Sequence, residues 1–202
     1  MPVLRRYGFG EITSVTKADG TAYEKDADRL TQIGRPGLVL FYESFHRCPG
    51  QYFLYLYPYC ADNMQTYFHS SCGNLSGNVF RYTLKTAQSI YTVKEDPMLL
   101  SADQKMDVLL NSGTITKEEG TAIMEECRKN KNVSAYSIYV RRMTRNLPES
   151  LYDVLMDEDS DNQVISDEIE DAFHDGSISP DQARYLNNKY VNFSRHRTYY
   201  YI

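Results

Sequence analysis

The sequence has 202 residues, no tryptophan and only four cysteines. The cysteines are irregularly spaced, so the disulfide framework of a small secreted domain is not expected. No apolar run approaches the length of a membrane span, and the first six residues lead into no apolar segment typical of a signal peptide. We therefore expect a protein of a reducing cytoplasm, bacterial or phage-infected, with no membrane partner.

Sequence motifs of the common enzyme classes are also missing. The chain contains no G-x-S-x-G, no P-loop, no G-x-G-x-x-G and no H-E-x-x-H. None of its four histidines has an evident catalytic partner along the sequence. We therefore predict no catalytic residues, no enzymatic activity and no cofactor, with calcium, and after it zinc, as the alternatives.

Negative charge is in excess in the second half of the chain. Residues 1–95 carry 10 Lys and Arg against 8 Asp and Glu, whereas residues 96–202 carry 12 against 19, and the net charge is −5. Nucleic-acid binding depends on Lys and Arg contacts to phosphates. The acidic balance therefore makes nucleic acid an improbable partner.

One pattern occurs twice in this second half. Residues 109–119 and 172–182 align without gaps, 63 positions apart. In each copy an apolar helical stripe runs into a glycine, Gly113 or Gly176, which can adopt the left-handed conformation that ends a helix. Thr116 and Ser179 then occupy N-cap positions, and the capping boxes are completed three residues later by Glu119 and Gln182. Each copy is predicted to form a helix hairpin.

The repeated pattern, an apolar helix followed by G-x-I-[ST]-x-[ED]-[EQ], resembles the short C-terminal (SHOCT-type) helical hairpins of many bacterial and phage proteins. The resemblance spans about residues 102–130 and 167–192. It implies an oligomerisation or docking module without catalytic residues. Two ordinary, well-capped helix hairpins would explain the same residues.

We predict an α+β protein with a boundary near residue 96. Residues 1–96 read as a small β-barrel-like domain, and residues 97–202 read as a helical domain with a basic, aromatic tail. The expected strands are 7–15, 38–42, 51–59, 78–82 and 89–94, with a turn-rich stretch at 70–77. The expected helices are 102–112, 117–130, 135–145, 148–156, 167–174 and 180–192. For residues 133–143 a strand is the alternative, because their Tyr, Ile and Val content also suits one.

A short pattern in the barrel region suggests the origin of the chain. Residues 86–91, Thr-Ala-Gln-Ser-Ile-Tyr, follow a strand expected to end near Tyr82. This T-x-x-S-x-Y arrangement resembles one found in small β-rich phage and mobile-element proteins. The resemblance implies no activity, but it favours a phage or mobile-element protein.

An acidic segment is the first candidate site. Residues 149–175 contain 11 Asp and Glu and no Lys or Arg. Asp157, Asp159, Asp161 and Glu168 fit positions 1, 3, 5 and 12 of an EF-hand loop, which predicts a calcium site. Asn162 replaces the usual glycine of that loop, and a solvated acidic linker would explain the same composition.

Thiol and imidazole groups gather in the barrel region, where zinc could bind. They come within 27 residues at His46, Cys48, Cys60, His69 and Cys72. Thiolates and imidazoles are the ligands of tetrahedral zinc, but the C-x-x-C spacing of common zinc sites is missing. Small buried cysteines at strand ends are the alternative interpretation.

One expected strand carries a wholly aromatic face, formed by Phe53, Tyr55, Tyr57 and Tyr59. Such a face can stack nucleotide or single-stranded bases, with Arg81 and Lys85, together with Arg35 and Arg47, supplying positive charge. It can also form a protein interface. A strand that is apolar on both faces is, however, usually covered on both.

Protein binding is the leading functional hypothesis. The contact residues we expect are Asp157, Glu158, Asp159, Asp161, Asp167 and Glu168 in the acidic segment and Tyr199, Tyr200 and Tyr201 in the tail. The partner would be a host or virion protein or a second copy of the chain, and an acidic face that mimics DNA would suit an anti-defence role. Arg141, Arg142 and Arg145, with Arg195 and Arg197, could face the acidic segment within the chain or in a neighbour, although solvated charge is the commoner explanation of such a basic patch. The alternatives are a nucleotide-binding or single-strand-binding barrel and a metal-dependent enzyme using the His/Cys cluster.

Overall fold

The computed structural model describes residues 3–25, 27–44, 50–60, 67–78 and 80–191. The chain divides into two compact units, residues 1–114 and 115–202. The α+β class is confirmed, because a β-barrel is followed by helices. The division falls later than the boundary expected near residue 96, and it lies inside the first repeat, because helix α1 (Ala102–Asn111) packs on the barrel strands.

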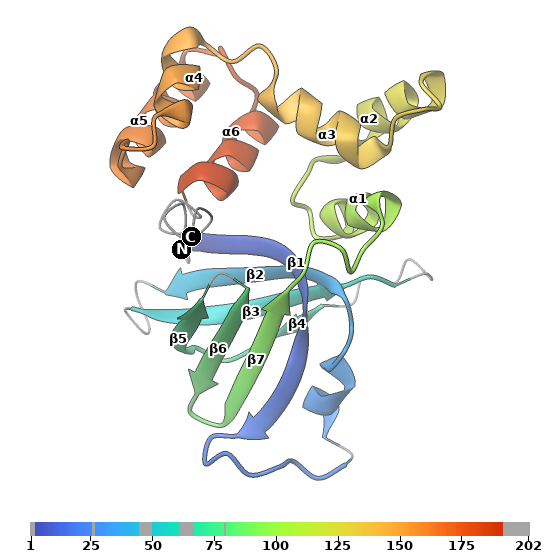
Figure 1. Cartoon of the computed structure of the whole chain (residues 1–202), viewed down its shortest axis with the longest axis vertical. Helices are drawn as coiled ribbons and strands as arrows, with labels where there is room; N and C mark the ends of the chain where they lie inside the picture. The colour runs from blue at the N-terminus through green and yellow to red at the C-terminus, as the bar shows by residue number, and fades with distance from the viewer. Residues whose placement is uncertain (1–2, 26, 45–49, 61–66, 79, 192–202) are drawn as a thin grey trace. The chain divides into compact units, whose positions relative to one another are not determined.

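Six strands of the first unit form a closed antiparallel barrel (Figure 1). They are β1 (Val3–Lys17), β2 (Gly37–Ser44), β3 (Gln51–Pro58), β5 (Gly73–Asn78), β6 (Arg81–Thr86) and β7 (Ser89–Glu95). Their order is β2-β1-β7-β6-β5-β3, and pairing of β3 with β2 closes the ring. A two-residue strand, β4 (Phe68–His69), adds to β3, and a 3-10 helix, η1 (Asp28–Gln32), follows β1.

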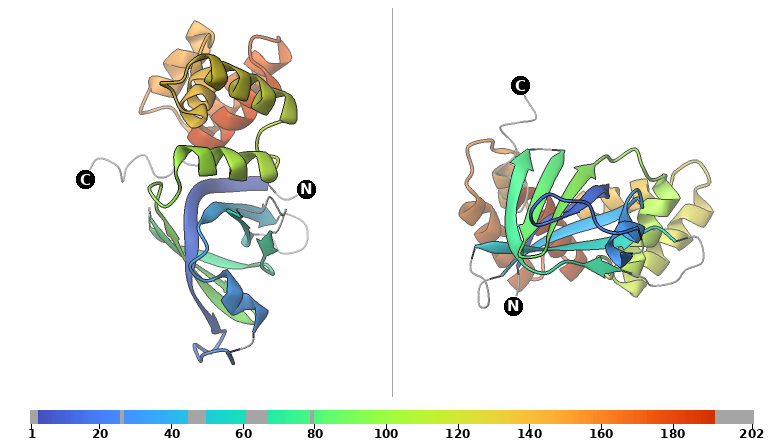
Figure 2. Two further views of the ribbon diagram at one scale, coloured as in Figure 1. Left: turned by 90° about the vertical axis from the view of Figure 1, so that its right-hand side faces the viewer. Right: turned by 90° about the horizontal axis from the view of Figure 1, so that it is seen from below.

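Strand β1 closes the barrel because it pairs with two neighbours in succession. Its first part pairs with β2 and its second part with β7, and the strand bends sharply between them (Figure 2). Gly10 takes part in both pairings, opposite Gly37 and Glu95. A Cβ atom at Gly10 would clash with the backbone of Lys94 and Glu95. The close approach of these strands therefore requires glycine at this position.

The barrel interior is filled by residues that alternate along the strands. They are Ile12, Val15, Val39, Phe41, Leu54, Leu56, Tyr82, Leu84, Tyr91 and Val93. On the outside, α1 packs against β2 and β3, where the outward-facing Leu38 and Leu40 are also buried. Helix α1 begins with a capping box between Ser101 and Gln104.

Most expected strands are confirmed, and one is wrong. The strands expected at 7–15, 38–42, 51–59 and 89–94 correspond to β1, β2, β3 and β7. The strand expected at 78–82 is instead a hairpin end, where Asn78 pairs with Arg81, and the stretch expected to be turn-rich contains β5. Strand β5 was missed because Gly-Asn-Leu-Ser-Gly-Asn has no apolar alternation and supplies only Leu75 to the core.

The second unit contains α2 (Lys117–Lys129), α3 (Ala135–Thr144), α4 (Glu149–Met156), α5 (Asn162–His174), α6 (Pro180–Leu186) and a π-helical turn, η2 (Asn187–Val191). Helix α2 packs against α3, α3 against α6, α6 against α5, and α5 against α4. Buried aliphatic residues of this unit include Ile123, Ile138, Leu151, Ile165 and Ile169. No helix in the described ranges has the length and apolar character needed to cross a membrane.

The helices agree with expectation except at two places. Helix α5 begins at Asn162 rather than at residue 167, because Asp161 caps it by accepting hydrogen bonds from the backbone N–H groups of Gln163 and Val164. Helix α6 ends at Leu186, and the chain continues to Val191 as a π-helical turn rather than as the same α-helix.

Candidate functional site

The two repeats end their first helices in the same way. In α1, Thr114 N–H donates to the Leu109 carbonyl at 3.0 Å; in α5, Ser177 N–H donates to the Ala172 carbonyl at 3.0 Å. The intervening glycines, Gly113 and Gly176, have φ values of 69° and 79°. This is the Schellman geometry, which requires a left-handed residue after the helix. The expected role of both glycines is confirmed.

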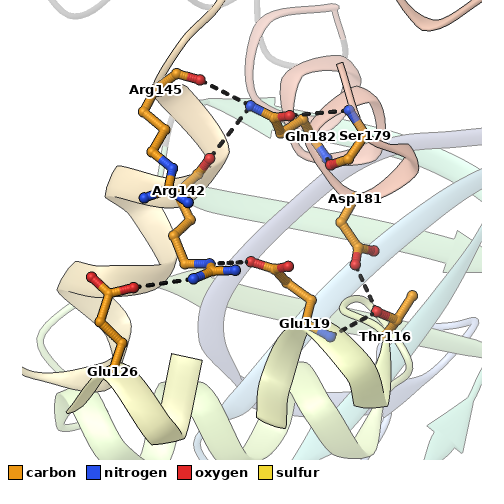
Figure 3. Close-up of polar contacts among 8 residues, drawn as sticks. All are labelled: Thr116, Glu119, Glu126, Arg142, Arg145, Ser179, Asp181 and Gln182. Carbon is orange, nitrogen blue, oxygen red and sulfur yellow. Dashed lines mark hydrogen bonds and ion pairs between the residues drawn. The ribbon is translucent and has the colours of Figure 1, made fainter. Parts of the chain in front are cut away.

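The N-termini of the second helices of the two repeats are joined by a hydrogen bond. The Thr116 hydroxyl donates to Asp181 Oδ2 at 2.7 Å, and it also accepts from the Glu119 N–H at 3.2 Å as the N-cap of α2 (Figure 3). Asp181 is 8% exposed, and its Oδ1 lies 3.5 Å from Arg184 Nη1. The cap of α2 is thereby fixed to the first turn of α6.

Arg142 on α3 joins this junction through two carboxylates of α2. Its Nε donates to Glu119 Oε1 at 2.6 Å, and its Nη1 donates to Glu126 Oε2 at 3.1 Å. The Arg142 and Glu119 side chains are each 20% exposed. The hydrogen bond that Arg142 donates to Glu119 raises the pKa of Arg142, so the guanidinium stays charged. Within the chain, Arg142 therefore pairs with carboxylates of α2 and not with the acidic segment.

Gln182 connects two helix ends. Its Oε1 accepts from the Ser179 N–H at 3.0 Å, which completes the expected capping box of α6. Its Nε2 donates to the Arg145 carbonyl at 3.1 Å and to the Arg142 carbonyl at 3.4 Å. One amide side chain therefore satisfies the start of α6 and the last carbonyl groups of α3.

These contacts surround a pocket of about 310 Å³, which we call the repeat pocket. Its lining comes from α2, from the end of α3 and from the start of α6, and Met143 is its buried apolar member. The lining residues are Glu119, Arg142, Met143, Arg145, Asn146, Ser177, Ser179 and Gln182. Asn146 is the one non-glycine residue with positive φ in the described part of the chain, at 54°.

The acidic segment forms α4, a short connection and α5. Asp157 accepts from the Asp159 N–H and the Ser160 hydroxyl, and Asp161 is the N-cap of α5. Glu168 lies inside α5, so residues 157–168 do not form the extended loop that the EF-hand spacing predicts. In the described ranges no three His, Cys, Asp or Glu side chains are grouped to hold a metal ion.

The predicted zinc ligands are only partly described. His46 and Cys48 lie outside the described residues, as does Arg47. Cys60 lies 3.1 Å from the Arg35 guanidinium, whereas His69 packs its ring against Tyr55 and Tyr67. Cys60 and His69 are thus directed to different neighbours, and Cys72 is half-buried. The zinc prediction and the metal-dependent enzyme that would use it remain untested.

The aromatic strand is β3, and its two faces differ. Leu54 and Leu56 point into the barrel, whereas Phe53, Tyr55 and Tyr57 are half-buried on the outside. The rings of Tyr55 and Tyr57 lie nearly parallel to Tyr67 on the neighbouring segment, with centroids 6.2 Å and 5.5 Å away. Arg81 and Lys85 are exposed on β6, which β5 separates from β3. Tyr59 is half-buried beyond the end of β3.

The predicted tail contacts Tyr199, Tyr200 and Tyr201 lie outside the described residues, together with Arg195 and Arg197. The repeat pocket was not predicted from the sequence. The sequence does contain residues of this pocket as recognisable features, namely the paired capping positions Glu119 and Gln182 and the basic residues at the end of α3. Nothing in the sequence, however, shows that these segments come together.

No family model, no curated protein and no solved structure matches the chain. Functional inference therefore rests on the site residues themselves.

Proposed function

We propose that this chain is a non-enzymatic interaction protein that binds another protein through the surface of α4 and α5. We call residues 149–175 the acidic hairpin. The observation that carries the proposal is the combination of 11 carboxylates, no Lys or Arg, and large apolar side chains left exposed on the same pair of helices. Exposed apolar groups rimmed by polar residues are typical of protein interaction sites.

The apolar groups of the acidic hairpin are in excess of what its fold needs. Leu151 and Leu155 bury one side of α4, yet Tyr152 and Met156, one helical turn apart, are 52% and 51% exposed. Tyrosine and methionine are enriched at the centres of protein interfaces. The two side chains supply a suitable apolar anchor for a partner.

Charge specifies the chemistry of that partner. Carboxylates of the acidic hairpin, among them Glu158, Asp159, Asp167 and Glu168, would attract a surface rich in Lys and Arg. We propose a basic protein of the host cell or the virion, as expected for a phage-encoded chain. If that basic surface normally holds DNA or RNA, the chain would act as an anti-defence mimic, and added DNA or RNA would weaken the complex.

Site-specific photo-crosslinking tests the proposal. p-Benzoylphenylalanine is placed at Tyr152 in one variant and at Tyr67, a similarly exposed tyrosine of the barrel unit, in a matched control. A discrete protein crosslinked from position 152 and not from position 67 is the expected result. Equal crosslinking from both positions, or none from position 152, would exclude the acidic hairpin as the contact surface. A second copy of the chain as the crosslinked protein would indicate self-assembly.

The aromatic face of β3 supports a second candidate function. Tyr55, Tyr57 and Tyr67 form a partly exposed set of near-parallel rings on the outside of the barrel, a surface on which nucleotide or single-stranded bases could stack. Nucleic acid crosslinked from position 67, or excess nucleic-acid absorbance in the purified protein, would favour it. The absence of both, with no melting-temperature shift on adding nucleotides, would count against it.

A further inference from the structure

The repeat pocket has a lining that differs in chemistry from the acidic hairpin. Six of its residues carry hydrogen-bond donors in their side chains, two of them arginines, against one carboxylate, Glu119. That carboxylate is already held by Arg142 at 2.6 Å. The remaining cation of the lining, Arg145, is therefore the charge that a ligand in the pocket would meet.

Several of these donors are available to a ligand. Among the described residues, the side chains of Arg145 and Asn146 have no hydrogen-bond or ion-pair partner. The Ser179 hydroxyl accepts from the Gln182 N–H, so its own proton can be donated elsewhere. The Ser177 hydroxyl, by contrast, is engaged with Asp175, whose pKa this hydrogen bond lowers. Three donor groups thus line one pocket without a described acceptor.

Gln182 also shields the backbone carbonyl groups that would repel an anion in this pocket. The last carbonyl groups of a helix carry partial negative charge, and α3 ends at this pocket. The Gln182 amide covers the Arg145 and Arg142 carbonyl groups. Asn146 is held at a φ of 54°, a conformation that costs most non-glycine residues free energy and that asparagine tolerates best.

We infer that the repeat pocket binds an oxyanion, a phosphate or carboxylate group of a small molecule, through Arg145, Asn146 and Ser179. Guanidinium groups bind both oxyanions through strong, charge-assisted hydrogen bonds. A volume of about 310 Å³ limits the ligand to a small metabolite or to one end of a larger one. The inference is independent of the proposed role of the acidic hairpin.

The test uses inorganic phosphate and acetate as probes and NMR chemical shifts of the full chain as the readout, with sodium chloride at matched ionic strength as the salt control. Saturable shifts confined to residues 145–146 and 177–182 are the expected result. A preference for phosphate or for acetate then identifies which oxyanion the ligand carries. Shifts no larger than those in sodium chloride would overturn the inference.

Variants separate pocket binding from general attraction of anions. Arg145→Gln should weaken binding of the preferred probe by at least about 10-fold. Asn146→Gly, which suits the positive φ at this position, should weaken that binding by about 3-fold. Arg141→Gln is the matched control, because Arg141 is an exposed arginine of α3 outside the pocket lining. Equal weakening by Arg141→Gln and Arg145→Gln would refute a specific site. Circular dichroism confirms that each variant is folded.

Discussion

The ion pair between Arg142 and Glu119 should hold α2 and α3 together, and it should do so more strongly than the pair with Glu126. The Glu119 contact is 2.6 Å long between side chains that are each 20% exposed, whereas the Glu126 contact is 3.1 Å long and Glu126 is 34% exposed. Hydrogen bonds to charged groups contribute about 1.5–3 kcal/mol when shielded from water, and exposed ion pairs contribute about 0.2–1 kcal/mol. We expect a coupling free energy of about 1.5 kcal/mol for Glu119 and about 0.5 kcal/mol for Glu126.

Two double-mutant cycles measure these couplings. One combines Arg142→Met with Glu119→Gln, and the other combines Arg142→Met with Glu126→Gln. Hydrogen exchange of peptides from α2 and α3 reports the free energy of opening of the helical unit alone, which avoids assuming that both units unfold together. A Glu119 coupling below about 0.5 kcal/mol, or a Glu126 coupling larger than the Glu119 coupling, would show that the shorter and less exposed contact is not the stronger one.

Three further predictions follow from backbone geometry and titration. Gly176→Ala and Gly113→Ala should each destabilise the chain by about 1 kcal/mol, because both glycines have positive φ, and thermal melts would show this. Burial raises the pKa of Tyr136 to about 12 and also raises the pKa of Tyr139. The stability that the two neutral phenols contribute below pH 10 should therefore be lost as pH rises through about 12. A pH titration should show tyrosinate absorbance appearing together with the loss of helical circular dichroism. Burial, with Asp103 nearby, raises the pKa of Asp107, so its carboxyl lends stability below pH 3.8 that is lost as pH rises through the folded pKa. Asp107→Asn should therefore raise the melting temperature at neutral pH, by an amount that shrinks in acid.

The sequence predicts those parts of the fold whose signals are local. The Schellman turns at Gly113 and Gly176 and the capping box at Ser179 each depend on a few neighbouring residues, and each has the expected geometry. The capping box expected at Thr116 is only half formed: Thr116 caps the Glu119 N–H, but the Glu119 carboxylate binds Arg142 instead of reaching back to the Thr116 N–H. The barrel strands with alternating apolar residues were located for the same reason. Strand β5 was missed because its place in the barrel is set by neighbouring strands rather than by its own residues.

The candidate sites were harder to predict because they depend on contacts between distant segments. The EF-hand spacing at Asp157 to Glu168 matched in sequence, but Asp161 is an N-cap and the rest of the segment is helical. The repeat pocket joins residues near positions 119, 142–146 and 177–182. No local pattern shows that the two repeats meet through Thr116 and Asp181.

If the acidic hairpin provides the binding surface, reversing the charge of its carboxylates should weaken partner binding. The crosslinked partner is titrated with wild-type protein, with Glu158→Lys/Asp159→Lys, and with the control Asp19→Lys/Asp103→Lys, which changes two exposed carboxylates of the barrel unit. We expect the acidic-hairpin variant alone to bind about 100-fold more weakly, with a smaller salt dependence. Equal affinity of both variants would contradict this expectation.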